Sequence, residues 1–429
     1  MISVELINTG SELLLGRTLN THGQWLARRL SDSGYTITRQ VSVPDTGESI
    51  ESAVRESLAR ADLVVTTGGL GPTSDDLTRD KVAGMLGRKL VEDPGTLRRI
   101  EQFFEDRKRL MPASTRVQAW VPTGAEILLN DFGTAPGLAF ELCPNPFCAG
   151  KSRSILAMLP GPPRELRPMF DKSLLPWLRA RMPLDTEWAC RNLRTVGIGE
   201  SFVEELIAGP LQGLIERGLE IGYCAHVGQV DVRLSSQGRG SEHIVGEAVL
   251  IVRELLGARI FGEGDDSLES AVLQALREAG LKLAISESCT GGLVANRITN
   301  SGGASDVFIA GVVSYSNESK ASLLRVPIEL IEAHGAVSQE VAASMAEGVR
   351  SCLNADYGLG LTGIAGPGGG TSEKPVGTVF IAVSSGTGTR AIKRFNPYDR
   401  VTFKEVTSTQ ALDLLRREIL GVGRDDKTP

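Results

Sequence analysis

Apolar residues in the first part of the chain follow two alternating spacings. Segments 2–8, 35–43 and 62–69 are short runs rich in Val, Ile, Leu and Thr, as in buried strands, and the last of them ends in a glycine turn. Residues 22–34 and 48–61 instead place apolar side chains every three or four positions, which is typical of helices. Strands that alternate with helices predict a parallel sheet in an α/β fold.

The pattern changes further along the chain. Residues 154–166 predict a strand, a proline turn and a helix, and residues from about 175 to 262 mix strand-like and helical stretches in a small α+β unit. The glycine-rich, acidic segment 261–270 marks a boundary before a second α/β pattern. In that pattern we predict strands at 281–286, 306–316, 357–363 and 376–385, and helices at 267–280, 291–300, 338–354 and around 410–420.

We therefore predict two α/β domains with mainly parallel sheets that flank a small α+β middle domain. The predicted boundaries are 1–172, 173–262 and 265–425. The chain has 429 residues, 41% hydrophobic and 23% charged, as in soluble globular proteins. No apolar stretch approaches the roughly 20 residues that span a bilayer. The first residues lack the basic start of a signal peptide, and the scattered cysteines form no zinc pattern, so we expect a cytoplasmic protein with no membrane partner.

Charge argues against a nucleic-acid partner. The net charge is -6, which gives no general attraction to phosphate backbones. From Asp185 to Arg259 there are eleven acidic and seven basic residues, a balance of -4. We therefore expect the middle domain to act as a spacer or in dimerisation, and the chain to form a homodimer.

The segment 286–292, "SESCTGG", follows a predicted strand and precedes a predicted helix. Ligands in open α/β sheets favour this edge, and free N–H groups at a helix start can hold a phosphate or an oxyanion. A serine here needs a nearby base to become a nucleophile. Cys289 is a rival nucleophile because a thiol at a helix start can be acidic. No second group is identified to orient this thiol, so we interpret it as a packed neighbour.

The base is not obvious from spacing. His334 is the one histidine of this domain and could equally end a helix, so no Ser-His-Asp arrangement can be recognised. Serine–lysine pairs are the alternative. Lys320 follows the end of a predicted strand, whereas Lys282 starts its strand at the opposite end and Lys374 lies in a loop. Spacing alone favours Lys320 without deciding the matter.

Two glycine-rich loops follow other strands. "LTGIAGPGGGTSEKPVGTV" (361–379) is long enough to wrap a small polar ligand through its backbone. In the first domain, "TTGGLGPTSDDLT" (66–78) lacks the lysine of a Walker loop but can still cradle an anion. Its carboxylates, Asp75 and Asp76, are able to bind a divalent metal or, alternatively, one of them caps the next helix. Asp45 and Glu12 also follow predicted strands at the same sheet edge.

Five motifs of the last domain occur together and in order over about 155 residues: "ESCTGGL", "AGVVSYSNESK", "HGAVS", "TGIAGPGGG" and "EKPVGT". They resemble the C-terminal domain of the competence/damage-inducible protein A (CinA) family, which is similar to nicotinamide mononucleotide (NMN) deamidases. The resemblance implies hydrolysis of the carboxamide to nicotinate mononucleotide and ammonia without a cofactor. It also implies Ser288 as nucleophile, Lys320 as general base, and Tyr315 beside them as a catalytic residue.

The same resemblance implies a set of substrate contacts. Arg400, in "PYDR", is a candidate for the nucleotide phosphate. The chain departs from the family where Ser286 replaces a usual alanine and Gly368 a common aspartate. The other implied substrate contacts are Thr290, Gly291, Gly292, Ser316, Asn317, Thr362, Gly363 and Gly366.

Residues 1 to about 170 resemble the molybdopterin-binding-like domain at the N-terminus of the same family, through "GSELLLG", "TGGLGPTSDDLT" and "LPGPPREL". The middle unit resembles the family's small KH-like domain. The N-terminal resemblance implies a metal-dependent ADP-ribose pyrophosphatase, with a divalent ion of the Mg, Mn or Co class. The metal ligands would be Asp45, Asp76 and Glu12, of which the two aspartates would also be catalytic, while His22 replaces a common asparagine. The implied substrate contacts of this domain are Gly68, Gly69, Gly71 and Thr73.

The sequence thus favours a bifunctional pyridine-nucleotide hydrolase that acts on two small nucleotides, NMN and ADP-ribose. One alternative is a competence or DNA-damage accessory protein that acts as a binding module. A second alternative keeps the N-terminal domain as a pterin- or nucleotide-binding module without hydrolysis.

Overall fold

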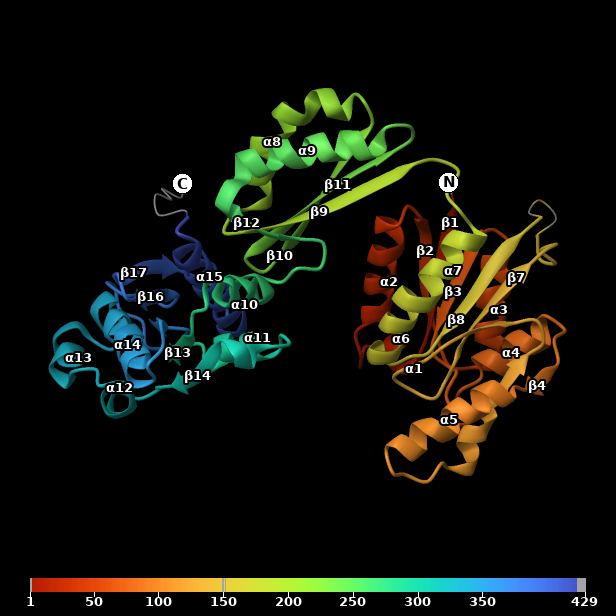
Figure 1. Cartoon of the computed structure of the whole chain (residues 1–429), viewed down its shortest axis with the longest axis horizontal. Coiled ribbons are helices and arrows are strands. Elements are labelled where there is room, and N and C mark those ends of the chain that lie inside the picture. The colour runs from red at the N-terminus through yellow and green to blue at the C-terminus, as the bar shows by residue number, and fades with distance from the viewer. Residues whose placement is uncertain (1, 149, 151, 423–429) are drawn as a thin grey trace. The chain divides into compact units, whose positions relative to one another are not determined.

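The structure is a computed structural model that describes residues 2–148, 150 and 152–422 (Figure 1). The chain divides into two compact units, Met1–Trp188 and Ala189–Pro429. None of the helices in the described part of the chain combines the length and the apolar character needed to cross a membrane.

The first unit is built on a sheet with the strand order β2-β1-β3-β8-β7-β6. The pairs β1–β2, β1–β3 and β3–β8 are parallel, whereas β7 and β6 continue the sheet in antiparallel fashion. A short antiparallel pair, β4–β5, lies apart from it. The strands are β1 (Ser3–Thr9), β2 (Thr36–Val43), β3 (Leu63–Thr67), β4 (Leu90–Glu92), β5 (Trp120–Pro122), β6 (Glu126–Leu128), β7 (Gly137–Leu142) and β8 (Ser154–Leu159).

Helices cover both faces of this sheet, as Figure 1 shows. One core joins α2, α6 and α7 to side chains such as Leu6 and Val65, and the other joins α3 and α4 to Ile7 and Val64. Neighbouring strand residues therefore point to opposite buried faces, which explains the continuous apolar runs in the sequence. The helices are α1 (Ser11–Leu14), α2 (Thr21–Asp32), α3 (Gly47–Leu58), α4 (Thr78–Met85), α5 (Pro94–Asp106), α6 (Pro163–Met169) and α7 (Leu175–Arg181).

The second unit begins with a small sheet in the order β10-β11-β9-β12. Helices α8 and α9 pack on it through an apolar core that includes Ile207, Val232 and Val252. This arrangement confirms the α+β character that we predicted for the middle of the chain. Its elements are β9 (Trp188–Val196), α8 (Glu200–Ile215), β10 (Leu219–His226), β11 (Gln229–Gln237), α9 (Ser241–Leu256) and β12 (Ile260–Glu263).

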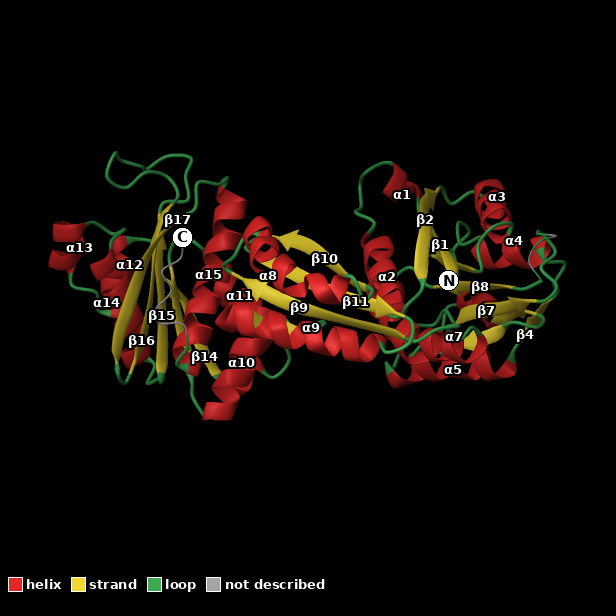
Figure 2. Ribbon diagram, turned by 90° about the horizontal axis from the view of Figure 1, so that it is seen from above, coloured by secondary structure: helices red, strands yellow, loops and turns green. Residues whose placement is uncertain are grey.

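The same unit continues into a sheet with the order β14-β13-β15-β16-β17. The strands β14, β13 and β15 are parallel, and β16 and β17 are antiparallel. Figure 2 shows α14 on one face of this sheet and α15 on the other. The elements are α10 (Leu268–Ala279), β13 (Leu283–Glu287), α11 (Leu293–Thr299), β14 (Phe308–Val313), α12 (Asn317–Leu324), α13 (Ile328–His334), α14 (Gln339–Cys352), β15 (Tyr357–Gly363), β16 (Thr378–Ser385), β17 (Gly388–Phe395) and α15 (Arg400–Leu420).

Two glycines of β15 bring α14 close to the sheet. A Cβ atom on Gly358 or Gly360 would collide with the α14 main chain at Ala346 or Ala342. The alternating glycines in "YGLGLTG" therefore permit a close helix–sheet contact that larger residues would block.

The predicted fold class is confirmed, with two local corrections. The sequence patterns missed the antiparallel strand β7 of the first sheet and the antiparallel edge strand β17 of the last sheet. The strand predicted at 306–316 ends at Val313, because Ser316 starts the unpredicted helix α12. This second difference matters because α12 carries Lys320.

Candidate active site

Ser288 comes directly after β13, at the carboxyl end of the strand. Its N–H donates to the Leu361 carbonyl at 3.1 Å, and its own carbonyl accepts from the Gly291 N–H at 3.1 Å. The residue is 9% exposed. Its main chain is therefore fixed between β15 and the following turn, with the side chain near the surface of the sheet edge.

A capping box places Lys320 in α12. The Ser316 hydroxyl accepts from the Ser319 N–H, and the Ser319 hydroxyl accepts from the Ser316 N–H. These reciprocal bonds satisfy helix-start donors and end the preceding extended segment. Lys320 lies one turn into the helix that they begin, on its buried side.

Lys320 contacts the candidate nucleophile. Its Nζ atom lies 3.2 Å from Ser288 Oγ, 2.8 Å from the Ser314 carbonyl and 3.4 Å from the Tyr315 carbonyl. The side chain is 1% exposed, and no ion pair within the described residues involves it. The structure thus brings together the pair that spacing left open.

Burial lowers the pKa of the Lys320 ammonium from its ordinary value of 10.5, because a buried charge loses its hydration. A neutral lysine amine has two N–H donors and one lone pair. The carbonyls of Ser314 and Tyr315 are placed to accept the two donors, which leaves the lone pair for the Ser288 hydroxyl proton. The contacts around Lys320 therefore suit the base form of this amine.

Cys289 is a packed core residue, as we interpreted it. Its side chain is 5% exposed and belongs to the core on the α10, α11 and α15 face of the sheet. Burial raises the pKa of its thiol to about 12, and the neighbouring Glu287 carboxylate adds to the rise. A thiol with that pKa is protonated at neutral pH, so it is a poor nucleophile.

The start of α11 does not offer the free N–H groups that we expected. The buried Glu287 carboxylate accepts from the N–H groups of Gly292, Val294 and Ala295 at 2.8–3.1 Å. The acid therefore replaces an external anion at this helix start. The expectation of an anion-binding helix start is wrong for these three N–H groups.

Arg400 links Tyr315 to the long glycine-rich loop. It donates from Nη2 to the Tyr315 hydroxyl and from Nη1 to the Gly366 carbonyl, both at 2.8 Å. The Tyr315 ring is 61% exposed, and its hydroxyl is bonded to Arg400 rather than to the Ser288–Lys320 pair. Arg400 thus ties the loop to the segment that carries Lys320.

The remaining predicted contacts have different local roles. Thr290 is fully buried, and its hydroxyl has no partner among the described residues. The Thr362 hydroxyl donates to the Ala336 carbonyl at 2.7 Å, which fixes the loop before α14. Gly291 and Gly292 adopt positive φ angles, as the turn after Ser288 requires. Asn317 is exposed, Gly363 is half-buried, and Ser316 caps α12.

Three residues outside the pair are explained by the structure. The Ser286 hydroxyl is buried and donates toward the carbonyls of Met345 and Leu359, so it points into the sheet and away from catalysis. His334 ends α13, as its alternative interpretation predicted. Lys374 donates to the His334 carbonyl at 2.7 Å and belongs to a loop contact.

At the N-terminal sheet edge, Asp45 is bonded to the start of α1 and Asp76 is bonded within its own loop. The Ser11 N–H donates to Asp45 Oδ2 at 2.8 Å. The Thr73 N–H and hydroxyl both donate to Asp76 Oδ2, at 2.9 and 2.5 Å. Neither Asp75 nor Asp76 caps α4, whose N-cap residue is Leu77, so the capping alternative is wrong.

These carboxylates do not form a cage of three metal ligands. Among the residues that the structure describes, no three His, Cys, Asp or Glu side chains are grouped closely enough to hold a metal ion. Glu12 is exposed in α1. Nucleotide-bound Mg²⁺ usually takes one or two carboxylates and completes its shell with substrate phosphates and water. The Oδ1 atoms of Asp45 and Asp76 carry no hydrogen bond from a described residue, so either aspartate fits that second arrangement.

The glycine turn beside them has polar neighbours that the sequence motifs did not single out. Gly68 and Gly69 have φ angles of 94° and 69°. A Cβ atom on Gly69 would collide with the Thr78 hydroxyl. The hydroxyls of Thr66 and Thr78 are buried and have no hydrogen-bond partner within the described residues. Thr78 lies nine residues after Gly69, so its place beside the turn depends on the fold and has no local signal in the sequence.

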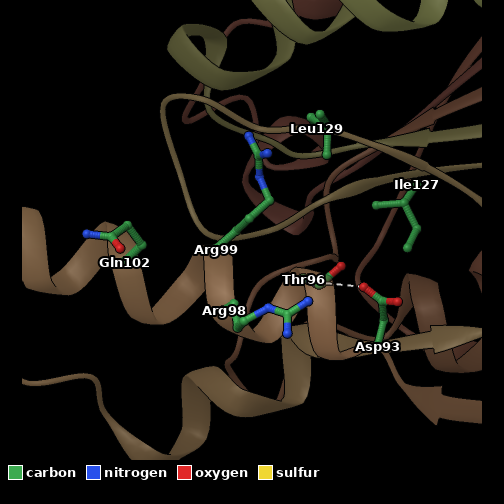
Figure 3. Close-up of a pocket in the computed structure, with 8 residues that line it drawn as sticks. Asp93, Thr96, Arg98, Arg99, Gln102, Ile127 and Leu129 are labelled. Carbon is green, nitrogen blue, oxygen red and sulfur yellow. Dashed lines mark hydrogen bonds between the residues drawn. The ribbon is translucent and has the colours of Figure 1, made fainter.

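A separate groove of about 420 Å³ lies between α5 and the β6 region. In Figure 3, Arg99 lies near Leu129, and Asp93 lies beside Thr96. The Asp93 carboxylate accepts a hydrogen bond from the Thr96 N–H at 2.6 Å. None of the predicted site residues lines this groove. Its lining residues are Asp93, Gly95, Thr96, Arg98, Arg99, Gln102, Ile127 and Leu129.

The chain is similar over almost its whole length to known proteins. The chain is 44% identical over 412 residues to a CinA-like protein of Akkermansia muciniphila, with 96% of each chain covered. It is 41% identical over 430 residues to a CinA-like protein of Gemmatimonas aurantiaca, with 99% of this chain and 98% of that protein covered.

The chain belongs to the CinA family. Family profiles match in the expected order: a probable molybdopterin binding domain at 5–180, the damage-inducible protein CinA KH domain at 190–262, and the CinA C-terminal domain at 265–419. The first match contains Asp45 and Asp76, and the third contains Ser288 and Lys320.

A solved structure is also similar to part of this CinA-family chain. The competence/damage inducible protein CihA from Agrobacterium tumefaciens is 37% identical to it. The match covers 34% of this chain and 91% of that one, with a TM-score of 0.34.

Proposed function

We propose that the C-terminal site hydrolyses the carboxamide of nicotinamide mononucleotide to a carboxylate and ammonia. The observation that carries this proposal is the 3.2 Å contact between Ser288 Oγ and the buried Lys320 Nζ. A serine nucleophile paired with a lysine base is a known solution for acyl transfer. The family resemblance supplies the substrate.

In the first half of the reaction, Ser288 Oγ bonds to the carboxamide carbon while its proton passes to the neutral Lys320 amine. The carbonyl oxygen becomes an oxyanion in the tetrahedral intermediate. The intermediate then collapses, the C–N bond breaks, and Lys320 returns the proton to the leaving nitrogen, which departs as ammonia. The product of this half is an ester on Ser288.

In the second half, water attacks the ester carbon and gives its proton to Lys320. The C–Oγ bond then breaks, Ser288 Oγ takes the proton back from Lys320, and the carboxylic acid leaves and loses its remaining proton to water. Thr290 is a candidate donor to the oxyanion, because its buried hydroxyl has no partner among the described residues. The Ser314 hydroxyl, which is also buried and without a described partner, is a second candidate.

The experiment is an ammonia-release assay on the purified chain with NMN, repeated with Ser288→Ala. We expect the wild-type chain to release ammonia and the variant to lose this activity. Cys289→Ser serves as the matched control, because it changes the adjacent thiol, which the structure places in the core, and should leave most of the activity. Full deamidation by Ser288→Ala would show that the nucleophile is assigned wrongly.

We propose a second hydrolytic site in the N-terminal unit, where the CinA-family resemblance implies ADP-ribose pyrophosphatase activity. The observation that favours a phosphate ligand is the Gly68–Gly69 turn beside the buried hydroxyls of Thr66 and Thr78, which have no partner among the described residues. The Gly68 N–H already donates to the Leu159 carbonyl at 3.0 Å, so the positive-φ Gly69 is the residue that can bring a main-chain N–H close to an anion. A divalent ion held by Asp45 or Asp76 together with substrate phosphates would neutralise phosphate charge.

This second proposal is tested by AMP release from ADP-ribose. We expect Thr78→Val, which removes the buried hydroxyl and keeps the shape of the side chain, to weaken ADP-ribose binding. Thr38→Val is the matched control on β2, since its hydroxyl donates to the Val4 carbonyl within the sheet. Equal effects of the two variants would show that the Thr78 hydroxyl has no special role. A homodimeric state and a cytoplasmic location remain predictions.

A further inference from the structure

The phosphate of a nucleotide substrate needs positive charge near Ser288, and the nearest helix start cannot supply it. The Glu287 carboxylate already accepts the N–H groups of Gly292, Val294 and Ala295. A phosphate at this position would also be repelled by the carboxylate. A cationic side chain is therefore the natural alternative.

Two cations on α15 lie one helical turn apart, Arg400 and Lys404. Arg400 is already engaged, because its two terminal nitrogens donate to the Gly366 carbonyl and the Tyr315 hydroxyl. Lys404 Nζ makes no hydrogen bond or ion pair with the residues that the structure describes. A half-buried amine without a partner is available to an anionic ligand.

The Lys404 amine also lies beside the turn that follows Ser288. Its Nζ atom lies 3.6 Å from the position that a Cβ atom on Gly291 would take. Gly291 belongs to the turn whose N–H closes onto the Ser288 carbonyl. Because glycine has no side chain, the space between this turn and the amine stays open, and Gly291 itself is exposed.

We infer that Lys404 binds the phosphate of the substrate and makes the amidase selective for nucleotides over nucleosides. This inference rests on the proposed amidase function and deepens it. Arg400 then orders Tyr315 and the long loop, while Lys404 provides the free charge. The ligand class is a phosphomonoester that carries a pyridine carboxamide.

Lys374 is the other lysine near this end of the domain, and it suits the role less well. Its Nζ atom donates to the His334 carbonyl at 2.7 Å. That contact joins the glycine-rich loop to the end of α13. Lys404 is therefore the better candidate.

The test compares two substrates that share the same carboxamide, NMN and the corresponding nucleoside without phosphate. For Lys404→Gln we expect kcat/KM for NMN to fall about 10- to 100-fold, as for loss of a charged hydrogen bond, and the nucleoside value to stay within about 2-fold. Lys404→Arg should restore most of the preference for NMN. Lys393→Gln removes an exposed positive charge from β17 and serves as the control.

Two outcomes would overturn the inference: an unchanged NMN-to-nucleoside ratio in Lys404→Gln, or equal losses on both substrates. A binding measurement separates this failure from failure of the amidase proposal. Calorimetric titration of Ser288→Ala with NMN, with and without Lys404→Gln, reports phosphate recognition without turnover. Lys404-dependent binding of NMN, together with no ammonia release by the wild-type chain, would support the phosphate site and reject the amidase.

Discussion

The two α/β sheets of this chain each place a glycine turn after a parallel strand, yet they assemble their candidate sites differently. In the C-terminal sheet, Ser288 after β13 and Lys320 from α12 meet at 3.2 Å. In the N-terminal sheet, Asp76 bonds to Thr73 three residues away in its own loop. The first site thus joins a nucleophile and a base from two elements, whereas in the second Asp76 is held within its own loop and Asp45 is held by Ser11 of α1.

The difference shows what a motif at a sheet edge establishes. Both edges bring polar residues to the place where α/β proteins bind ligands. At the C-terminal edge, however, an amine is held in a position with 1% exposure and no ion-pair partner among the described residues. Burying a charge-forming group in this way costs stability and is retained mainly at functional sites. The N-terminal carboxylates carry no comparable burial, because Asp75 is exposed and Asp76 is half-exposed.

The largest expected effect comes from substitutions that break the Ser288–Lys320 pair. We expect Ser288→Ala and Lys320→Met each to lower ammonia release from NMN by about 10³-fold or more, because nucleophile and base act as one unit. Their combination should cost little beyond either single change. Measured kcat values for the two single variants and the double variant check this expectation.

Lys282→Met is the matched control for Lys320→Met. Lys282 lies before the opposite end of β13, and its Nζ atom donates to the Asp306 carbonyl. It should therefore keep most of the amidase activity. Additive losses in the double variant of Ser288 and Lys320 would contradict a shared catalytic step.

The next largest expected effect is that metal removal distinguishes the activities proposed for the two sheets. We expect EDTA to leave ammonia release unchanged, because Ser288 and Lys320 supply the nucleophile and the base. ADP-ribose cleavage should fall by about 10²-fold or more, since it needs the phosphate charge to be neutralised. Parallel assays of ammonia and AMP on one chelated sample check the split, and re-addition of Mg²⁺ or Mn²⁺ should restore the second activity. Metal-independent cleavage of ADP-ribose would contradict the roles given to Asp45 and Asp76.

The sequence predicted much of the fold because buried parallel strands and amphipathic helices carry strong periodic signals. It identified the Ser288 turn from the apolar strand before it. It left Lys320 open, because a capping box of two serines, Ser316 and Ser319, begins a helix whose apolar pattern is weak. A lysine in a short polar segment is normally a surface residue.

Other features depend on contacts that no local pattern records. Glu287 looks like a polar residue at a strand end, yet its carboxylate folds onto the start of α11. The edge strand β17 is only partly buried and alternates weakly, so its pairing with β16 could not be read from periodicity. In the N-terminal unit, the motifs located the sheet edge but not the bonds from Ser11 and Thr73 that hold the aspartates.

A smaller effect concerns the Glu287 contact that distinguishes the C-terminal turn. Glu287→Gln replaces one acceptor oxygen by an NH₂ group that faces main-chain donors, so we expect a loss of about 2 kcal/mol in unfolding free energy. The amide protons of Gly292, Val294 and Ala295 should exchange faster with solvent. Hydrogen exchange followed by mass spectrometry or NMR checks this without depending on catalysis.

Glu278→Gln is the control, since Glu278 is exposed on α10 and accepts a surface hydrogen bond from Gln274. Tryptophan fluorescence should miss both changes, because all four tryptophans, Trp25, Trp120, Trp177 and Trp188, precede Ala189. Unchanged amide exchange in Glu287→Gln would mean that the carboxylate does not hold the helix start.

The smallest expected effect is a pH dependence of the unfolding free energy and of the amidase rate, which comes from Lys320 and has no counterpart in the N-terminal site. Burial lowers the pKa of folded Lys320 below 10.5, while the unfolded chain keeps the ordinary value. Between these two pKa values the unfolded chain binds the extra proton, so the free energy of unfolding rises with pH. Below the folded pKa both states are protonated, and the cost of the buried ammonium is fully present.

Wild-type protein should therefore gain stability relative to Lys320→Met as the pH rises toward 10.5, because methionine has no proton to lose. The kcat/KM for NMN should rise as the pH approaches the folded pKa of Lys320 and level off above it, where the stability difference begins to grow, since the neutral amine is the base. Urea unfolding followed by circular dichroism at several pH values, together with the rate profile, measures both slopes. A constant stability difference with a rising rate would place the titrating base elsewhere, whereas a rate that levels off at the pH where the stability difference begins to grow would tie both to Lys320.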